Sequence, residues 1–234
     1  MTRTRGSGAR TAVTTLPSDR TGERLARFDG VERALHWVNA ALFFVVLFTA
    51  GALYVGPLST IVGRRALVKE VHVISGLLLP VPFILARIGP WSRGLRRDMR
   101  ALNRWDGDDR RWFRTLGRDR SVRLGKFNPG QKLNAAFVAG SIPVMLATGS
   151  IMKWFGPFSD SWRTGATFVH DWIAIGLFAV IVGHIAIALS DPDALRGMVR
   201  GWVPASWARR HRPKWFDEVA ATAGGHVSPR SEPS

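Results

Sequence analysis

Long uncharged runs alternate with highly charged segments along this chain. Asp, Glu, Lys and Arg are absent from four runs, residues 34–63, 71–86, 133–152 and 172–190. A helix of about 20 apolar residues crosses the roughly 30 Å hydrocarbon layer of a membrane. Pro80 and Pro82 interrupt the second run, but neighbouring helices can satisfy the backbone groups that a proline frees. The pattern therefore predicts an all-α membrane protein, a bundle of four transmembrane helices. These spans are expected at residues 34–56, 68–88, 133–153 and 167–190.

Two other interpretations of the apolar runs fit less well. A secretory signal peptide would need a cleavage site and a soluble domain after it, whereas the first run begins more than thirty residues from the start. A soluble core would need amphipathic helices, and four long uncharged runs in 234 residues leave little amphipathic surface. The membrane interpretation is therefore preferred.

The segments outside the runs define the expected domain organisation. Residues 1–27 and 220–234 are poor in apolar side chains and are expected to be disordered tails. Residues 28–219 form the membrane domain. Its central basic loop, residues 89–132, carries several Trp and Phe among its charges. We expect this loop to lie partly folded against lipid headgroups or a partner.

Charge then orients the chain. There are 33 Lys and Arg against 17 Asp and Glu, a net charge of +16. Such a charge suits nucleic acid or an anionic membrane surface. However, 28 of the basic residues lie in residues 1–33, 87–132 and 191–234, and five lie in the other two connections. The positive-inside rule predicts a multi-pass plasma-membrane protein with both termini cytoplasmic, so no nucleic-acid partner is needed.

The absence of cysteine removes whole classes of function. With no Cys in the chain, disulfides, Cys-ligated zinc, iron–sulfur clusters, thiolate nucleophiles and covalently attached c-type haem are all excluded.

Four histidines lie within or at the ends of the predicted spans, at positions 36, 72, 170 and 184. Ionisable side chains are costly in a membrane, so each is a candidate functional residue. His170 and His184 are fourteen residues apart on the fourth span, which places them on one helix face roughly 21 Å apart. The alternating direction of the spans puts His36 and His184 at the cytoplasmic depth. It puts His72 and His170 at the outer depth.

Two depth-matched histidine pairs in an apolar bundle are typical of two bis-histidine b haems. Three glycines are candidates for close approach of a porphyrin to the helices: Gly76, Gly176 and Gly183. Any single histidine could instead be a hydrogen-bonded packing residue. A zinc or other transition-metal transporter would need converging carboxylates or further histidines, and Asp171 is the only acidic residue in the fourth span, with Glu70 at the start of the second. His211 and His226 lie in polar segments and are expected to be solvated.

Several segments together resemble a known family. They are F-D-x-V-E-R-A-L-H-W at 28–37, E-V-H-V-I-S-G at 70–76, G-K-F-N-P-G-Q-K-L-N at 125–134 and the H-x13-H spacing of the fourth span. A further segment is R-G-M-V-R-G-W-V-P-A-S-W-A-R-R-H-R-P-K-W-F at 196–216. The chain resembles the membrane cytochrome b (gamma) subunit of respiratory formate dehydrogenases and, more distantly, the cytochrome b of nickel–iron hydrogenases.

The resemblance implies two b haems, ligated by His36 with His184 and by His72 with His170. It implies electrons arriving from an iron–sulfur beta subunit, fed by a molybdenum- or tungsten-dependent catalytic alpha subunit. The acceptor would be menaquinone or ubiquinone. The chain would then be an electron-transfer subunit of an oxidoreductase complex in anaerobic respiration, not a stand-alone enzyme, and would have no catalytic residue of its own.

The resemblance also implies a quinone pocket at the N-x-G-Q motif, here Asn128 and Gly130, with Gln131 beside them. Pro129 stands where a small residue is commoner in the family and restricts Asn128 to extended conformations. Without the resemblance, Asn-Pro-Gly reads as a turn before a helix. Two alternatives stay open: a cytochrome b serving a hydrogenase or another dehydrogenase, and a histidine-based metal transporter.

Overall fold

The computed structural model describes residues 23–89 and 92–224. Its helices confirm the predicted four-helix membrane bundle. Four spans are long and apolar enough to cross a membrane. They are α1 (Gly30–Tyr54), α3 (Arg65–Leu78) continuing as α4 (Val81–Ile88), α7 (Pro129–Lys153) and α8 (Asp160–Ser190). The short helix α2 (Gly56–Val62) joins the first two spans.

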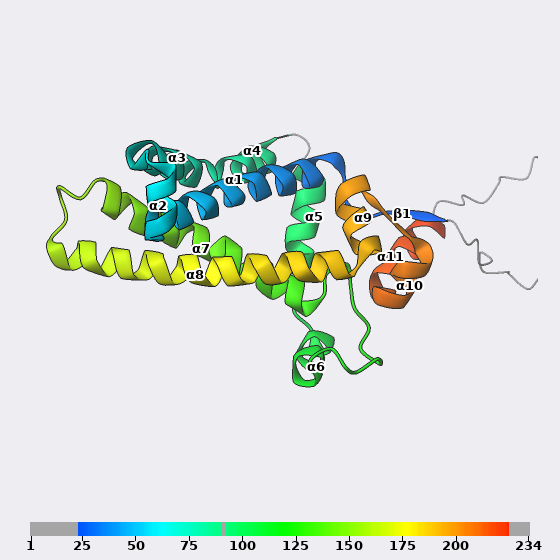
Figure 1. Ribbon diagram of the computed structural model, residues 1–234. Helices are drawn as coiled ribbons and strands as arrows, with labels where there is room; N and C mark the ends of the chain where they lie inside the picture. Colours follow the sequence, from blue (N-terminus) through cyan, green and yellow to red (C-terminus); the bar gives the residue numbers. More distant parts are fainter. Residues whose placement is uncertain (1–22, 90–91, 225–234) are drawn as a thin grey trace, which may run out of the picture.

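The four spans pack as two pairs that run lengthwise through the molecule (Figure 1). Helix α1 lies along α3, and α7 lies along α8, while α3 and α7 make the contact between the pairs. Large apolar side chains point away from the bundle; Phe48 is 73%, Ile88 78% and Ile187 71% exposed. Apolar side chains on the outside of a bundle are what a lipid-facing surface requires.

The second span is interrupted where the sequence places its prolines. Helix α3 ends at Leu78, and α4 begins after Pro80 with Pro82 in its first turn. A proline lacks the backbone N–H of a regular helix turn and clashes with the preceding turn, but it is well accommodated at a helix start. In contrast, α7 continues unbroken through Pro143.

The central basic loop is folded. It contains α5 (Ser92–Asn103) and α6 (Gly107–Thr115), and α5 crosses the end of the bundle in Figure 1, contacting α1, α4 and α7. Two buried ion pairs attach these helices to the approach and start of α7. Lys126 Nζ lies 2.6 Å from Asp98 Oδ1, and Lys132 Nζ lies 2.7 Å from Asp109 Oδ2.

The chain ends form a small module at the same end of the bundle (Figure 1). Strand β1 (Arg24–Ala26) pairs antiparallel with β2 (Trp202–Pro204). Helices α9 (Pro192–Arg200), α10 (Ala205–His211) and α11 (Pro213–Gly224) complete the module. Its core contains Val203, Trp207, Ala208 and Trp215. We call the end that carries this module with α5 and α6 the basic end. The far end carries α2 and the α7–α8 connection.

Parts of the expected tails are therefore ordered. Residues 24–26 form β1 because a distant strand supplies their hydrogen-bond partners, and α11 reaches Gly224. Residues 1–22 and 225–234, which include His226, lie outside the described residues.

Candidate functional site

The bundle brings the four membrane histidines together as two pairs. The ring centres of His36 and His184 lie 6.2 Å apart near the basic end, with the ring planes inclined at 59°. Those of His72 and His170 lie 6.3 Å apart toward the far end, inclined at 64°. Each pair joins one helix of the α1–α3 pair to α8, so the rings face each other across the bundle.

The separation within each pair fits a shared metal centre. A metal–imidazole bond is about 2 Å long, so the centres of two imidazoles on opposite sides of one metal lie about 6 Å apart. Added Cβ atoms at Gly76 and Gly183 would meet nothing within 4 Å, which leaves open space beside the helices. A Cβ at Gly176 would instead approach the Phe137 ring at 3.3 Å. The ring spacing of the histidines therefore fits two ligands of one haem iron, and Gly76 and Gly183 leave open space on their helices.

The far-end rings are oriented by threonines from neighbouring helices. Thr49 Oγ1 lies 3.0 Å from His72 Nδ1, and Thr148 Oγ1 lies 3.0 Å from His170 Nδ1. Gly149 leaves room for the second ring, since a Cβ there would lie 3.3 Å from His170 Cε1. Sequence reasoning missed both threonines, because threonine is an ordinary residue in membrane helices and its partner lies more than twenty positions away.

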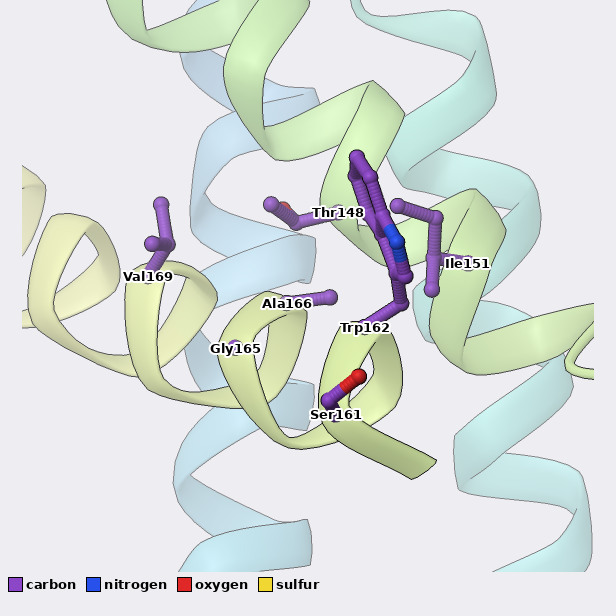
Figure 2. A pocket seen from close by; sticks show the side chains of 7 residues that line it. All are labelled: Thr148, Ile151, Ser161, Trp162, Gly165, Ala166 and Val169. Atoms are coloured by element: carbon purple, nitrogen blue, oxygen red, sulfur yellow. The ribbon is translucent and has the colours of Figure 1, made fainter. Parts of the chain in front are cut away.

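A hollow lies beside the far-end pair. It has a volume of about 360 Å³ and is lined by residues of α7 and the start of α8. Figure 2 shows Thr148 on one side and Trp162 and Ala166 on the other. Trp162 is 65% exposed, so the hollow opens at the surface, and Thr148 is one of the residues that line it.

The basic-end pair has different surroundings. The Trp37 indole meets the His36 ring edge-on at 5.3 Å between centres. Within residues 23–89 and 92–224, neither His36 nor His184 makes a hydrogen bond through its ring.

The proposed quinone residues lie at the start of α7, also at the basic end. Asn128 has the extended backbone that Pro129 requires and caps the helix: its side chain accepts from the Gln131 backbone N–H at 2.8 Å. The Gln131 side chain accepts in return from the Asn128 N–H at 3.0 Å. A Cβ at Gly130 would lie 3.5 Å from Trp112. The capping box uses the amide oxygens and leaves both amide NH₂ groups as donors.

A buried charged cluster beside this motif was not predicted. The Arg27 and Arg212 guanidinium carbons lie 4.7 and 5.4 Å from the Trp207 ring centre. Asp191 accepts from the Trp207 indole N–H at 3.0 Å. Burial, and secondarily repulsion by Arg212, lowers the pKa of Arg27 to about 9. Burial lowers the pKa of Arg212 to about 10. Arginine is normally exposed, so the sequence carried no signal for this cluster.

A metal-transport site would need several ligand side chains that converge on one point. Among the described residues, no three His, Cys, Asp or Glu side chains gather as a group that could hold a metal ion. His211 Nδ1 lies 3.1 Å from the Trp207 carbonyl, within the terminal module.

Comparison with known proteins agrees with the geometry. Residues 27–201 match the family described as prokaryotic cytochrome b561. The formate dehydrogenase cytochrome b556(fdo) subunit of Escherichia coli K12 is 29% identical over 213 residues, covering 86% of this chain and 95% of that protein.

Two further relatives bear similar names. The formate dehydrogenase cytochrome b556 subunit of Haemophilus influenzae is 28% identical, covering 83% of each chain. The nitrate-inducible formate dehydrogenase cytochrome b556(Fdn) subunit of E. coli K12 is 24% identical, covering 83% of this chain and 91% of that protein. By the match over most of its length, this chain belongs to the prokaryotic cytochrome b561 family.

Proposed function

We propose that this chain is the di-haem cytochrome b subunit of a membrane-bound respiratory formate dehydrogenase. It would pass electrons from an iron–sulfur partner across the membrane to quinone. The observation that carries the proposal is the presence of two histidine pairs with the spacing of a shared metal centre, one toward each end of an apolar bundle. The names of the relatives support formate dehydrogenase as the complex.

In this proposal His36 and His184 hold one haem b, and His72 and His170 hold the other. The haems, when bound, supply one-electron carriers within the low-dielectric bundle. The protein's own contribution is to orient the imidazoles, keep water away from them, and fix their positions on three packed helices.

The orientation follows from charge. The basic end carries the central loop and both described chain ends, and the three corresponding sequence segments hold 28 of the 33 basic residues. By the positive-inside rule the basic end faces the cytoplasm, and the far-end pair lies near the outer surface.

Quinone reduction is assigned to the basic end. The amide NH₂ groups of Asn128 and Gln131 are donors that can bind a quinone carbonyl without a buried charge. Gly130 permits close approach to the backbone. Protons for menaquinone or ubiquinone would enter from the cytoplasm, so transfer of electrons from an outer donor separates charge across the membrane.

The far end is the proposed contact for the iron–sulfur partner. The chain has no Cys and cannot hold a cluster itself. Exposed apolar side chains gather there in the connections, including Ile61 of α2 (80% exposed) and Trp154 after α7 (54% exposed). Such side chains are typical anchors in protein interfaces. A catalytic subunit containing molybdenum or tungsten would supply the electrons through this partner.

The proposal is tested by purifying the full chain from its native membrane with its partners. Two b haems per chain, co-purifying iron–sulfur and molybdenum or tungsten subunits, and haem reduction by formate are the expected results. Reduction by hydrogen but not by formate would assign the chain to a hydrogenase. A solitary protein that contains zinc and lacks the visible bands of haem would refute the proposal.

A further inference from the structure

The two histidine pairs have the same spacing but different hydrogen-bond partners. Both far-end rings have a threonine hydroxyl at 3.0 Å from Nδ1. Neither basic-end ring has a hydrogen-bond partner within residues 23–89 and 92–224. These hydrogen bonds involve Nδ1, the ring nitrogen that would not bind the shared metal. They therefore affect how strongly each imidazole can donate electrons to that metal.

The contacts of His72 determine which nitrogen carries its hydrogen. Its Nδ1 lies 3.2 Å from the Val46 carbonyl oxygen, which can only accept. The Thr49 hydroxyl donates its own hydrogen to the Val45 carbonyl at 2.7 Å, so its oxygen accepts from the imidazole. Nδ1 is therefore protonated, and Nε2 is left free to bind a metal.

The second helix pair repeats this arrangement. The Thr148 hydroxyl donates to the Val144 carbonyl at 2.8 Å and accepts from His170 Nδ1. The Thr148 hydroxyl also lies 3.3 Å from the Met145 carbonyl, as the Thr49 hydroxyl lies 3.0 Å from the Val46 carbonyl. The carbonyl three residues before each threonine therefore has the same place in α1 and in α7. Two different helices, α1 and α7, therefore hold a far-end histidine in the same way.

A hydrogen bond from Nδ1–H to oxygen makes an imidazole a more basic, more electron-donating ligand. Such a ligand stabilises oxidised iron more than reduced iron, and second-shell hydrogen bonding is one of the means by which proteins adjust haem potentials. We propose that Thr49 and Thr148 are positioning residues that lower the reduction potential at the far-end pair below that at the basic-end pair. This inference rests on the proposed function, because it requires haem at both pairs.

The difference in reduction potential between the two pairs would serve the proposed function. An electron moving from the outer surface to the cytoplasmic side moves toward the negative side of an energised membrane, which opposes it. A lower potential at the far end makes the step between the pairs favourable and offsets this opposition. The threonines thereby set the direction of transfer without contacting the iron.

The test uses the full chain in its purified complex and a redox titration of both haems by their optical spectra. Thr49→Val or Thr148→Val keeps the side-chain shape and removes the hydroxyl. Each variant is expected to raise the reduction potential of the far-end haem by about 59 mV, which corresponds to a tenfold change in the equilibrium constant of a one-electron couple. The reduction potential of the basic-end haem should stay unchanged. Thr49→Ser and Thr148→Ser should restore the native potential. The matched control is Thr167→Val on α8, since the Thr167 hydroxyl bonds to the Arg163 carbonyl and to no other group of the described residues.

Unchanged potentials in both valine variants, with haem retained, would overturn the inference. If a valine variant loses the far-end haem, a second measurement decides. This measurement uses the near-infrared charge-transfer band of oxidised haem, whose energy reports how strongly the ligands donate electrons. The band is compared between two variants: His36→Ala, which keeps the far-end haem, and His72→Ala, which keeps the basic-end haem. Different band energies, with stronger donation at the far end, support the inference, and equal energies contradict it. A native protein without two haems would instead refute the proposed function.

Discussion

The two ends of the bundle hold histidine pairs separated by 6.3 and 6.2 Å, yet the structure around each pair is built differently. At the far end the supporting groups are threonine hydroxyls and backbone carbonyls from the membrane helices themselves. At the basic end the rings have no such partners in the described chain. The nearby structure is the terminal module, together with α5 and α6, which two buried ion pairs attach to the bundle.

This difference shows how one bundle can serve two tasks. A ligand pair needs only two facing imidazoles, so the same spacing arises at both ends. Neutral hydrogen bonds are compatible with the hydrocarbon layer, whereas charged pairs need the water and headgroup boundary. The end that would meet quinone and protons therefore carries the buried ion pairs, whereas the far end has the more exposed pairs Lys153–Glu70 and Arg163–Asp160.

The largest expected effect is loss of one haem on removal of one histidine. His72→Ala and His170→Ala should each abolish the same far-end haem, because one remaining imidazole cannot supply both axial bonds. His36→Ala and His184→Ala should each abolish the other. Haem content per chain and low-temperature optical spectra measure the result. If His72 and His184 variants lose the same centre, the pairing is wrong.

The second prediction is that the basic end faces the cytoplasm, and a test of orientation has only two outcomes. A reporter fused after Ser234 should be active only in a form that requires the cytoplasm, because 28 of 33 basic residues lie in the segments on that side. Activity of a reporter that requires the outer compartment would reverse the orientation and exchange the roles of the two pairs.

The quinone motif should affect only the basic end. Asn128→Ala or Gly130→Val is expected to leave both haems spectrally intact and reducible by the partner, while stopping their reoxidation by quinone. Because Asn128 also caps α7, the control is Asn128→Asp, which keeps the cap and removes the amide donor. Stopped-flow reoxidation measures the effect. Reoxidation of all three variants at the native rate would place the site elsewhere.

A smaller effect is expected from the buried pair of Lys126 and Asp98, whose side chains are 7% and 8% exposed. Burial lowers the pKa of Lys126, so its charge depends on the partner carboxylate. Lys126→Met should destabilise the folded basic end by about 3–5 kcal/mol, because it leaves the buried Asp98 with only the exposed Arg97 guanidinium at 3.8 Å.

This destabilisation is measured by heating the variant and following the optical band of each haem. The band of the basic-end haem should be lost first. Lys126→Met combined with Asp98→Leu should recover most of the stability. The matched control, Arg123→Ala, breaks the ion pair between Arg123 and Asp217, whose side chains are 56% and 58% exposed. It should lower the free energy of unfolding by less than about 1 kcal/mol. Equal destabilisation by both single variants would contradict the argument.

The smallest expected effect is a pH dependence of the attachment of α6 to α11. The hydrogen bond from Lys214 lowers the pKa of Asp106. Partial burial opposes charge on Lys214, but hydrogen bonds to Asp106 and Asp108 raise its pKa overall. The stabilisation is therefore complete at neutral pH. It is lost as the pH falls through the lowered Asp106 value and as it rises through the raised Lys214 value.

Both groups of this pair are partly exposed, Lys214 to 34% and Asp106 to 44%, so solvent screens the pair and its contribution is within about 1 kcal/mol. Hydrogen exchange of α6 amides, compared between the native chain and Lys214→Met at several pH values, measures it. A pH response that Lys214→Met does not alter would mean that other groups hold α6.

Much of the membrane part of the fold could be predicted from local pattern. Each uncharged run marks a span, since length and apolarity decide whether a helix can cross a bilayer. The direction of successive spans then placed His36 with His184 and His72 with His170 at matched depths, and the structure brings these same residues within ring contact. The spans and the depths of the histidines could be predicted because they depend only on neighbouring residues in the sequence and on the thickness of the bilayer.

The tertiary structure decided what surrounds those histidines. Thr49 meets His72 only because α1 lies along α3, and Leu25 pairs with Val203 across nearly the whole chain. Such contacts depend on which faces of distant elements meet, and no local pattern of apolar and polar residues encodes that choice. The sequence alone determined that four helices cross the membrane with histidines at two depths. The packing of those helices decided which hydroxyls, carbonyls and charges support each pair, because these interactions act only over a few ångströms.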